Sequence, residues 1–237
     1  MNDPQLFVIA NLKANKTWDE VSSWIDDIAK PAVSFAGTII FCPSAPFLAA
    51  AFTKISQNGI NLKLGAQDIS RLEQGAYTGE FAASQIADLC QYAIIGHSER
   101  RKQFGETEED IIQKAKVLLA SQITPVLCIS DSDQLDIYIQ KGEFIKEKSS
   151  GIIFVYEPPS AISGGGTYKP DSPENANDQA KIFKQKIASK AIVLYGGSIN
   201  PENAQDFFSQ ENIDGGLVGQ ASLNPQKFIQ ILEAVNR

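Results

Sequence analysis

Apolar residues along this chain gather in short continuous runs rather than alternating with polar residues. Runs of four or five apolar residues recur from one end to the other, and amphipathic stretches separate them. Continuous apolar runs are typical of strands buried on both faces, as in parallel sheets covered by helices. The pattern predicts eight strands, at Leu6–Ala10, Thr38–Cys42, Leu62–Ala66, Tyr92–Ile95, Pro125–Ile129, Ile152–Tyr156, Ile192–Tyr195 and Gly215–Val218.

The segments between these strands carry helical signatures. Residues 17–29 place apolar side chains at helical spacing, and Thr107 with Asp110 resembles a capping box before a helix that reaches Ala120. Asn200-Pro201 and Asn224-Pro225 each put a capping residue before a proline suited to the first helical position. Further helices are expected over residues 44–56, 81–90, 133–147 and 172–189.

Strands and helices therefore alternate along the whole chain, with no linker or change of composition between them. Eight such units predict an α/β protein with one domain over residues 1–237, folded as a closed (β/α)8 barrel. An open, doubly wound sheet has the same alternation and is the alternative. Both folds bind ligands at the carboxyl ends of their strands, so the residues that follow each strand are the candidates for a site.

The first predicted strand is followed by Asn11 and Lys13, which lie on the same side of an extended backbone. Lys13 would serve as a fixed cation for a phosphate or an oxyanion, although most such lysines are simply solvated. The fourth strand is followed by His97, the single histidine of the chain. A helix expected to begin there disfavours the imidazolium form, which suits an electrophile or proton shuttle. A hydrogen-bonded structural histidine is the alternative.

The sixth predicted strand is followed by Glu157. Partial desolvation of a carboxylate directly after a buried run suits a general base, whereas a solvated strand-end glutamate would have no chemical role. The glycine-rich segment 160–167 that comes next has the composition of a hinged lid or of an ordinary surface loop.

Glycines also follow the seventh and eighth strands, at Gly196-Gly197-Ser198 and Gly219-Gln220. Glycine lets the backbone approach a phosphate closely, so that N–H groups can bind its oxygens, although each stretch alone is also a common turn. After the fifth strand, Asp131 and Asp133 could be considered as metal ligands. With no histidine nearby, capping of the next helix accounts for them, and we expect no metal site.

The composition of the chain excludes some classes of binding partner and location. The formal net charge is −7, which argues against nucleic acid. No apolar run approaches the ~18 residues of a membrane span, and the start of the chain lacks the basic region of a signal peptide. The three cysteines, Cys42, Cys90 and Cys128, form no Cys-x-x-Cys pair. They fit packed thiols in a reducing cytoplasm.

Taken together, the strand-end motifs resemble the triosephosphate isomerase family from end to end. The resemblance lies in Asn11-Leu12-Lys13, Gly65-Ala66-Gln67, Gly79-Glu80, the run from Ile94 to Arg101, Tyr156-Glu157-Pro158, Tyr195-Gly196-Gly197-Ser198 and the run from Asp214 to Gly219. It implies a TIM barrel without cofactor that interconverts dihydroxyacetone phosphate and glyceraldehyde 3-phosphate in glycolysis and gluconeogenesis. The family is a standard example of pKa tuning and lid closure.

The resemblance also implies roles for individual residues. Glu157 would take the carbon-bound proton, and His97, neutral, would polarise the carbonyl and move protons between the two oxygens. Lys13 and Asn11 would stabilise the enediolate, with Ser98 and Glu99 in support. The phosphate would be held by Asn11, Lys13, Ser163, Gly197, Ser198, Gly219 and Gln220.

The family is usually dimeric, and segment Asp68–Thr78 resembles its protruding interface loop. Thr78 would then support Lys13 of the partner subunit in a homodimer.

The chain departs from the family pattern mainly around the lid and the phosphate. Ser160 stands where tryptophan is usual, Ser163 and Gly164 where glycine and threonine are usual, and Gln220 where a second glycine is usual. Ser130-Asp131 replaces a Gly-Glu pair whose glutamate normally contacts the lid tryptophan, so the changes at Ser160 and Asp131 are expected to compensate each other. Two alternatives stay open: an isomerase for another short phosphosugar, and a catalytically silent barrel that only binds phosphorylated metabolites or a partner protein.

Overall fold

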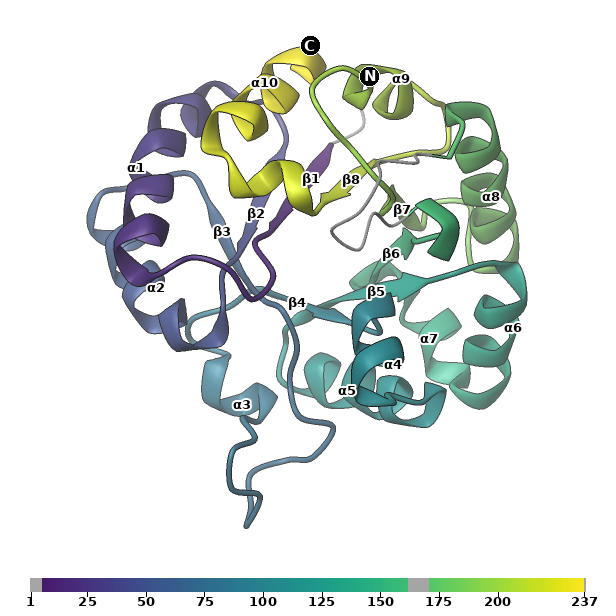
Figure 1. Ribbon diagram of the computed structural model, residues 1–237. Helices are drawn as coiled ribbons and strands as arrows, with labels where there is room; N and C mark the ends of the chain where they lie inside the picture. The colour runs from purple at the N-terminus through teal and green to yellow at the C-terminus, as the bar shows by residue number, and fades with distance from the viewer. Residues whose placement is uncertain (1–5, 162–170, 237) are drawn as a thin grey trace.

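Eight parallel strands close into a barrel in the computed structural model, which describes residues 6–161 and 171–236 (Figure 1). The strands stand in sequence order around the barrel, and β1 pairs with β8 as well as with β2. This closure confirms the predicted (β/α)8 barrel and excludes the open sheet. The strands are β1 (Phe7–Asn11), β2 (Thr38–Cys42), β3 (Lys63–Ala66), β4 (Tyr92–Ile95), β5 (Thr124–Ile129), β6 (Ile153–Tyr156), β7 (Ile192–Tyr195) and β8 (Gly215–Val218).

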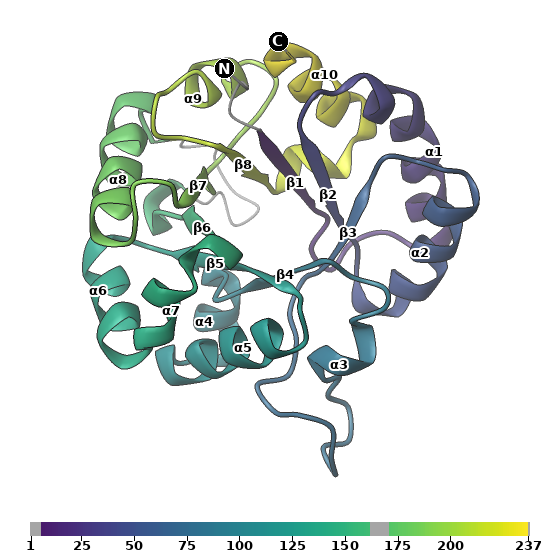
Figure 2. The ribbon, with the colours of Figure 1, turned by 180° about the vertical axis from the view of Figure 1, so that it is seen from behind.

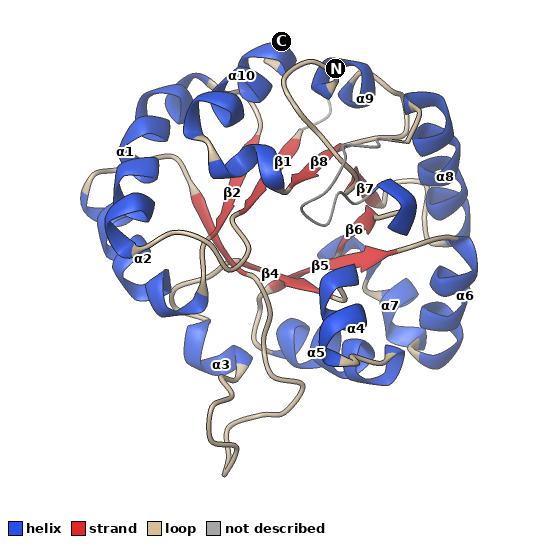
Figure 3. Cartoon of the chain, in the orientation of Figure 1, coloured by secondary structure: helices blue, strands red, loops and turns tan. Residues whose placement is uncertain are grey.

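Helices surround the barrel on its outside (Figure 3). They are α1 (Trp18–Ser34), α2 (Leu48–Gln57), α3 (Ala83–Ile86), α4 (Ser98–Phe104), α5 (Glu108–Ala120), α6 (Ser132–Lys141), α7 (Glu143–Glu147), α8 (Pro173–Lys186), α9 (Ala204–Phe208) and α10 (Pro225–Val235). Short 3₁₀ helices add η1 (Ala45–Phe47), η2 (Ser149–Gly151), η3 (Pro159–Ala161) and η4 (Gln220–Leu223). No helix in the described ranges combines the length and the apolar character that crossing a bilayer requires.

Alternate residues of each strand serve two separate apolar cores, as the period of two requires. One set fills the barrel interior and includes Ile9, Ile40 and Leu217. The other set packs between the sheet and the helices, where the Trp24 ring of α1 stacks on Phe41 with centroids 4.5 Å apart. Burial on both faces explains why the strands read as continuous apolar runs.

Some predicted helices differ from the observed ones for local reasons. The single helix expected over 133–147 is two helices, because Gly142 has non-helical backbone angles (φ −128°, ψ 69°) and ends α6. Only Ala83–Ile86 is helical in the expected segment 81–90. The Asn200 side chain accepts a hydrogen bond from Asn203 N at 2.9 Å, but the turn that it caps precedes α9, which begins at Ala204. Asn224 caps α10 as predicted.

The barrel closes where Gly215 of β8 pairs with Phe7 of β1. The φ angle of Gly215 is +135°, a value that side chains rarely allow. A Cβ atom at Gly215 would also lie only 1.9 Å from the carbonyl oxygen of Phe7. Closure of the barrel therefore depends on a residue without a side chain at this position.

We predict that Gly215→Ala lowers the free energy of unfolding by about 1–3 kcal/mol from backbone strain alone, with a further cost from the clash. Urea denaturation followed by circular dichroism measures the change. Gly151→Ala is the matched control, because a Cβ there would make an ordinary 3.6 Å contact with Leu119. Equal stability of the two variants would contradict the role given to Gly215.

Candidate active site

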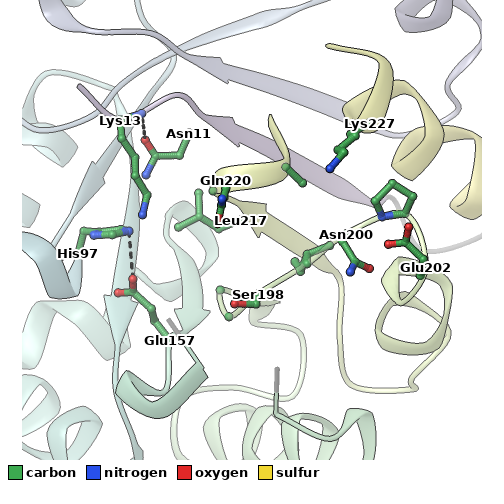
Figure 4. Close-up of a pocket in the computed structure, with 16 residues that line it drawn as sticks. Asn11, Lys13, His97, Glu157, Ser198, Asn200, Glu202, Leu217, Gln220 and Lys227 are labelled. Atoms are coloured by element: carbon green, nitrogen blue, oxygen red, sulfur yellow. Dashed lines mark hydrogen bonds and ion pairs between the residues drawn. The ribbon is translucent and has the colours of Figure 1, made fainter. Parts of the chain in front are cut away.

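A cavity of about 350 Å³ opens at the carboxyl ends of the strands (Figure 4). Residues far apart in the sequence line it, because parallel strands bring all of their carboxyl ends to one rim of the barrel. Most of the predicted site residues lie in this lining, namely Asn11, Lys13, His97, Glu157, Gly197, Ser198, Gly219 and Gln220.

His97 is the N-cap residue of α4 and is separated from the end of β4 by Gly96 alone. Its Nδ1 accepts a hydrogen bond from the backbone N–H of Glu99 at 3.2 Å, and the side chain is almost fully buried. An acceptor nitrogen carries no proton, so the ring proton of the neutral imidazole is on Nε2. Nε2 lies 3.0 Å from Oε1 of Glu157.

Glu157 follows β6, and its side chain is 1% exposed. Ser98 at the start of α4 holds the carboxylate with two hydrogen bonds, from its backbone N–H to Oε2 at 3.0 Å and from its hydroxyl to Oε1 at 3.1 Å. The Cys128 thiol of β5 also interacts with this carboxylate, and burial, with a smaller contribution from Glu157, raises the pKa of Cys128. A buried carboxylate with these partners is fixed in direction.

Lys13 has a left-handed backbone conformation, with φ at +52°. This is uncommon for a residue with a side chain and persists only where the surroundings impose it. Three neighbours do so: Asn11 Oδ1 accepts from Lys13 N at 3.0 Å, while Ser44 Oγ and Gln67 Nε2 donate to the Lys13 carbonyl oxygen at 3.1 and 2.8 Å. The backbone of Lys13 is therefore held on both sides.

The Lys13 ammonium forms an ion pair with Glu99. Gly219 at the end of β8 lies beside this ammonium, since a Cβ there would make ordinary contacts of 3.4 Å with Cε and 3.7 Å with Nζ of Lys13. Glu99 thus fixes the direction of the cation, while the carboxylate of Glu157 is bound separately by Ser98.

The turn after β7 packs closely against the Tyr195 side chain and the Ala161 carbonyl oxygen. A Cβ at Gly197 would lie 2.1 Å from the Tyr195 hydroxyl oxygen, which accepts a hydrogen bond from Asp171 N at 2.9 Å. Ser198 donates from both its N–H (3.0 Å) and its hydroxyl (2.7 Å) to the Ala161 carbonyl oxygen. These donors of Ser198 therefore face Ala161 in this structure.

Comparison with known proteins assigns the chain to a family. The family model "Triosephosphate isomerase" matches residues 6–235. The chain belongs to the triosephosphate isomerase family. Similar proteins include the triosephosphate isomerases of Polynucleobacter asymbioticus and Hydrogenovibrio crunogenus, both 37% identical over 97% of this chain and covering 99% and 98% of their own lengths. That of Thermus thermophilus is 34% identical over 96% of this chain and 98% of its own length.

Membership in the triosephosphate isomerase family confirms the resemblance and the class of enzyme, an isomerase, that the sequence predicts. Of the departures from the family pattern, Asp131 has a clear local role. Its carboxylate accepts hydrogen bonds from Asp133 N at 3.1 Å and Gln134 N at 2.8 Å and caps α6. This is the capping role expected from the sequence. Ser160 lies in η3, and nothing in the structure shows that Ser160 and Asp131 compensate each other.

Some predicted residues lie elsewhere or outside the described ranges. Thr78 is exposed on the loop between β3 and α3 and does not line the cavity. Ser163 and Gly164 lie outside the described residues. Within the described ranges, no group of three or more histidine, cysteine, aspartate or glutamate side chains could hold a metal ion.

Two residues that support the site, Gln67 and Ser222, had no role predicted from the sequence. Gln67 directly follows β3, so the strand-end rule could have indicated a role for it; it donates to the carbonyl oxygens of Lys13 and Cys42 at 2.8 and 2.9 Å. The Ser222 hydroxyl donates to Asn11 O (3.1 Å) and Gly219 O (2.6 Å), and so bridges the ends of β1 and β8. No sequence signal indicates that link.

We predict that the neutral imidazole of His97 carries its proton on Nε2, because Nδ1 accepts from Glu99 N. Nitrogen-15 NMR of the ring tests this, with Nδ1 expected as the unprotonated nitrogen and Nε2 as the protonated one. Assignment is unambiguous because the chain has one histidine. Protonation of Nδ1 would contradict the hydrogen bond from Glu99 N.

Proposed function

We propose that this chain interconverts dihydroxyacetone phosphate and D-glyceraldehyde 3-phosphate through an enediolate, as a step of glycolysis and gluconeogenesis. The observation that carries the proposal is the meeting of a buried carboxylate, an imidazole and a fixed ammonium in one cavity. These groups are Glu157, His97 and Lys13. Isomerisation of an aldose and a ketose needs a base, an electrophile at the carbonyl oxygen and a compensating charge.

Glu157 is the base. It takes a proton from one carbon of the substrate and returns a proton to the neighbouring carbon, so the carboxylate is regenerated and the reaction needs no co-reactant. Both of its oxygens accept hydrogen bonds from Ser98, at 3.0 and 3.1 Å. The carboxylate must give up at least part of this binding to reach a carbon-bound proton, which makes Ser98 a positioning residue.

His97 is the electrophile. Its Nε2–H donates to the substrate carbonyl oxygen and polarises it, and the same ring exchanges protons between the two substrate oxygens. The hydrogen bond at Nδ1 supports this role, because it leaves Nε2 as the donor. A neutral donor matches the weakly acidic enediol better than an imidazolium would.

Lys13 and Asn11 stabilise the negative charge of the enediolate. The Lys13 ammonium is held in direction by Glu99, so little reorganisation accompanies the build-up of charge. Asn11 is 5% exposed and lines the same cavity. Backbone N–H groups of Gly197, Gly219 and Gln220, with Ser163, bind the phosphate at the other end of the substrate. Ser198 joins them only when its donors leave the Ala161 carbonyl oxygen.

We propose further that the chain is a homodimer formed through the Asp68–Thr78 loop. This loop extends away from the barrel in both views (Figures 1 and 2). Lys114 and Arg100 anchor its base, with their nitrogens 2.6 and 2.8 Å from the Asp68 carboxylate. Its outer part carries Tyr77, a large side chain that is 45% exposed. A protruding loop with an exposed aromatic suits insertion into a partner.

The three buried free cysteines support a reducing cytoplasm as the location.

The proposed reaction is tested by following turnover of glyceraldehyde 3-phosphate in heavy water, without added metal and with chelator present. Dihydroxyacetone phosphate carrying solvent deuterium is the expected product, because a protein base exchanges its proton with solvent during the enediolate's lifetime. Folded protein that gives neither product nor exchange would refute the proposal.

We predict that Glu157→Gln lowers turnover by at least about 10²–10⁴-fold, the usual contribution of a positioned general base. Inhibition by inorganic phosphate should change little, because the phosphate binds at the other end of the cavity. Glu147→Gln, on the exposed face of α7, is the control for loss of one carboxylate. Turnover of Glu157→Gln equal to that of the control would contradict the role of the base.

We predict that analytical ultracentrifugation gives a mass of twice 25.8 kDa for the native chain and a single-chain mass for Tyr77→Asp. An aspartate in the centre of the interface would be buried without a partner, and this weakens the association of the two subunits. Val33→Asp changes another exposed apolar side chain, on α1, and should stay dimeric. A native monomer, or a dimer that Tyr77→Asp leaves intact, would rule out this interface.

A further inference from the structure

The cavity extends well beyond the residues that the sequence predicted. Its lining continues from Ser198 to Asn200, Pro201 and Glu202 after β7, and to Lys227 on the first turn of α10. Figure 4 shows Lys227 and Glu202 on the side of the cavity away from Lys13, His97 and Glu157. The cavity therefore has a second charged end.

The positive charge at this end belongs to the Lys227 side chain. Among the residues that the structure describes, its ammonium has no ion pair and no hydrogen bond. The start of α10 has fewer backbone donors for a ligand, because the N–H groups of Gln226 and Lys227 already donate to Asn224 Oδ1, at 2.9 and 3.2 Å. A ligand at this end of the cavity would therefore meet a side-chain cation that lacks an internal partner.

The two lysines of the cavity differ in their partners. Lys13 is paired with Glu99 and lies beside the reacting groups, whereas Lys227 is exposed and lies at the opposite side. Gln220 and Ser198 lie between them in Figure 4. A substrate with its reacting carbons at Glu157 and a dianion at its other end would point that dianion toward Lys227.

We propose that Lys227 is a specificity-determining residue that attracts the phosphate dianion, in addition to the backbone N–H groups of the turns after β7 and β8. The inference rests on the proposed function, because it takes the reacting end of the substrate to lie at Glu157. An ammonium attracts a dianion more strongly than a singly charged anion at the same distance, and it has no charge–charge attraction for a neutral end group. Lys227 thus favours phosphorylated substrates over their unphosphorylated analogues.

Glu202 weakens phosphate binding in this proposal, whereas Lys227 strengthens it. It is exposed and lines the same end of the cavity as Lys227. A carboxylate there repels a phosphate and competes for the ammonium, so loss of its charge should strengthen phosphate binding. Opposite effects of two substitutions at one end of the cavity distinguish local electrostatics from general damage to the fold.

The test is steady-state turnover of glyceraldehyde 3-phosphate by Lys227→Gln and Glu202→Gln at low ionic strength. We expect KM to rise about 3- to 10-fold for Lys227→Gln and to fall up to about 3-fold for Glu202→Gln, with kcat within about 2-fold of native in both. The change at Lys227 should shrink when salt is raised to 0.5 M, because exposed charges are screened.

The matched control is Lys190→Gln, which removes an exposed lysine just before β7, at the other end of the barrel. It changes the net charge equally and should leave KM unchanged.

Binding of inorganic phosphate, measured by calorimetry without turnover, gives a second readout and should weaken only in Lys227→Gln. This readout holds even if native protein fails to convert the triose phosphate, so failure of the proposed function and failure of this inference are distinguishable. If the Lys227→Gln variant has the same KM and the same phosphate affinity as the native enzyme, the inference is overturned.

Discussion

The closure of β1 onto β8 is the constraint on which the rest of the molecule depends. Parallel pairing around a full circle brings every strand's carboxyl end to one rim, and the register Phe7 with Gly215 decides how the first and last strands meet there. Because of that register, Lys13 comes to lie beside Gly219, although they are separated by most of the chain. Ser222 then joins the same two strand ends through Asn11 O and Gly219 O. The order and pairing of the strands therefore determine where the cavity lies, and the side chains then determine its chemistry.

The charged groups at this rim are organised by three consecutive residues at the start of α4. His97 accepts from the backbone of Glu99, Ser98 binds the Glu157 carboxylate, and Glu99 pairs with Lys13. A helix start supplies backbone N–H groups that point in one direction, and here one of them binds the imidazole and another binds a carboxylate. A single short turn therefore sets the directions of the base, the electrophile and the cation together. This keeps the three groups in a fixed arrangement although loops form the rim of the barrel.

Much of this arrangement could be predicted from the sequence, because the signals involved are local. Strands buried on both faces give continuous apolar runs, and β2, β4, β7 and β8 begin and end where expected. The residue after a strand is equally visible, which is why Lys13, His97 and Glu157 could be found. What could not be predicted depends on contacts between distant segments or on backbone angles: the break at Gly142, the hold of Gln67 on Lys13, the direction of the Ser198 donors, and Lys227 at the outer end of the cavity.

Closure by the last strand has a consequence for the chain as it leaves the ribosome. Until β8 has emerged, β1 and β7 are both unpaired edges of a parallel sheet, and each presents backbone donors and acceptors that another chain could bind. The apolar side chains that later fill the barrel, such as Ile9 and Leu194, are also uncovered at that stage. The nascent protein is therefore most prone to aggregation just before β8 emerges, and the few residues of β8 remove both edges in one step.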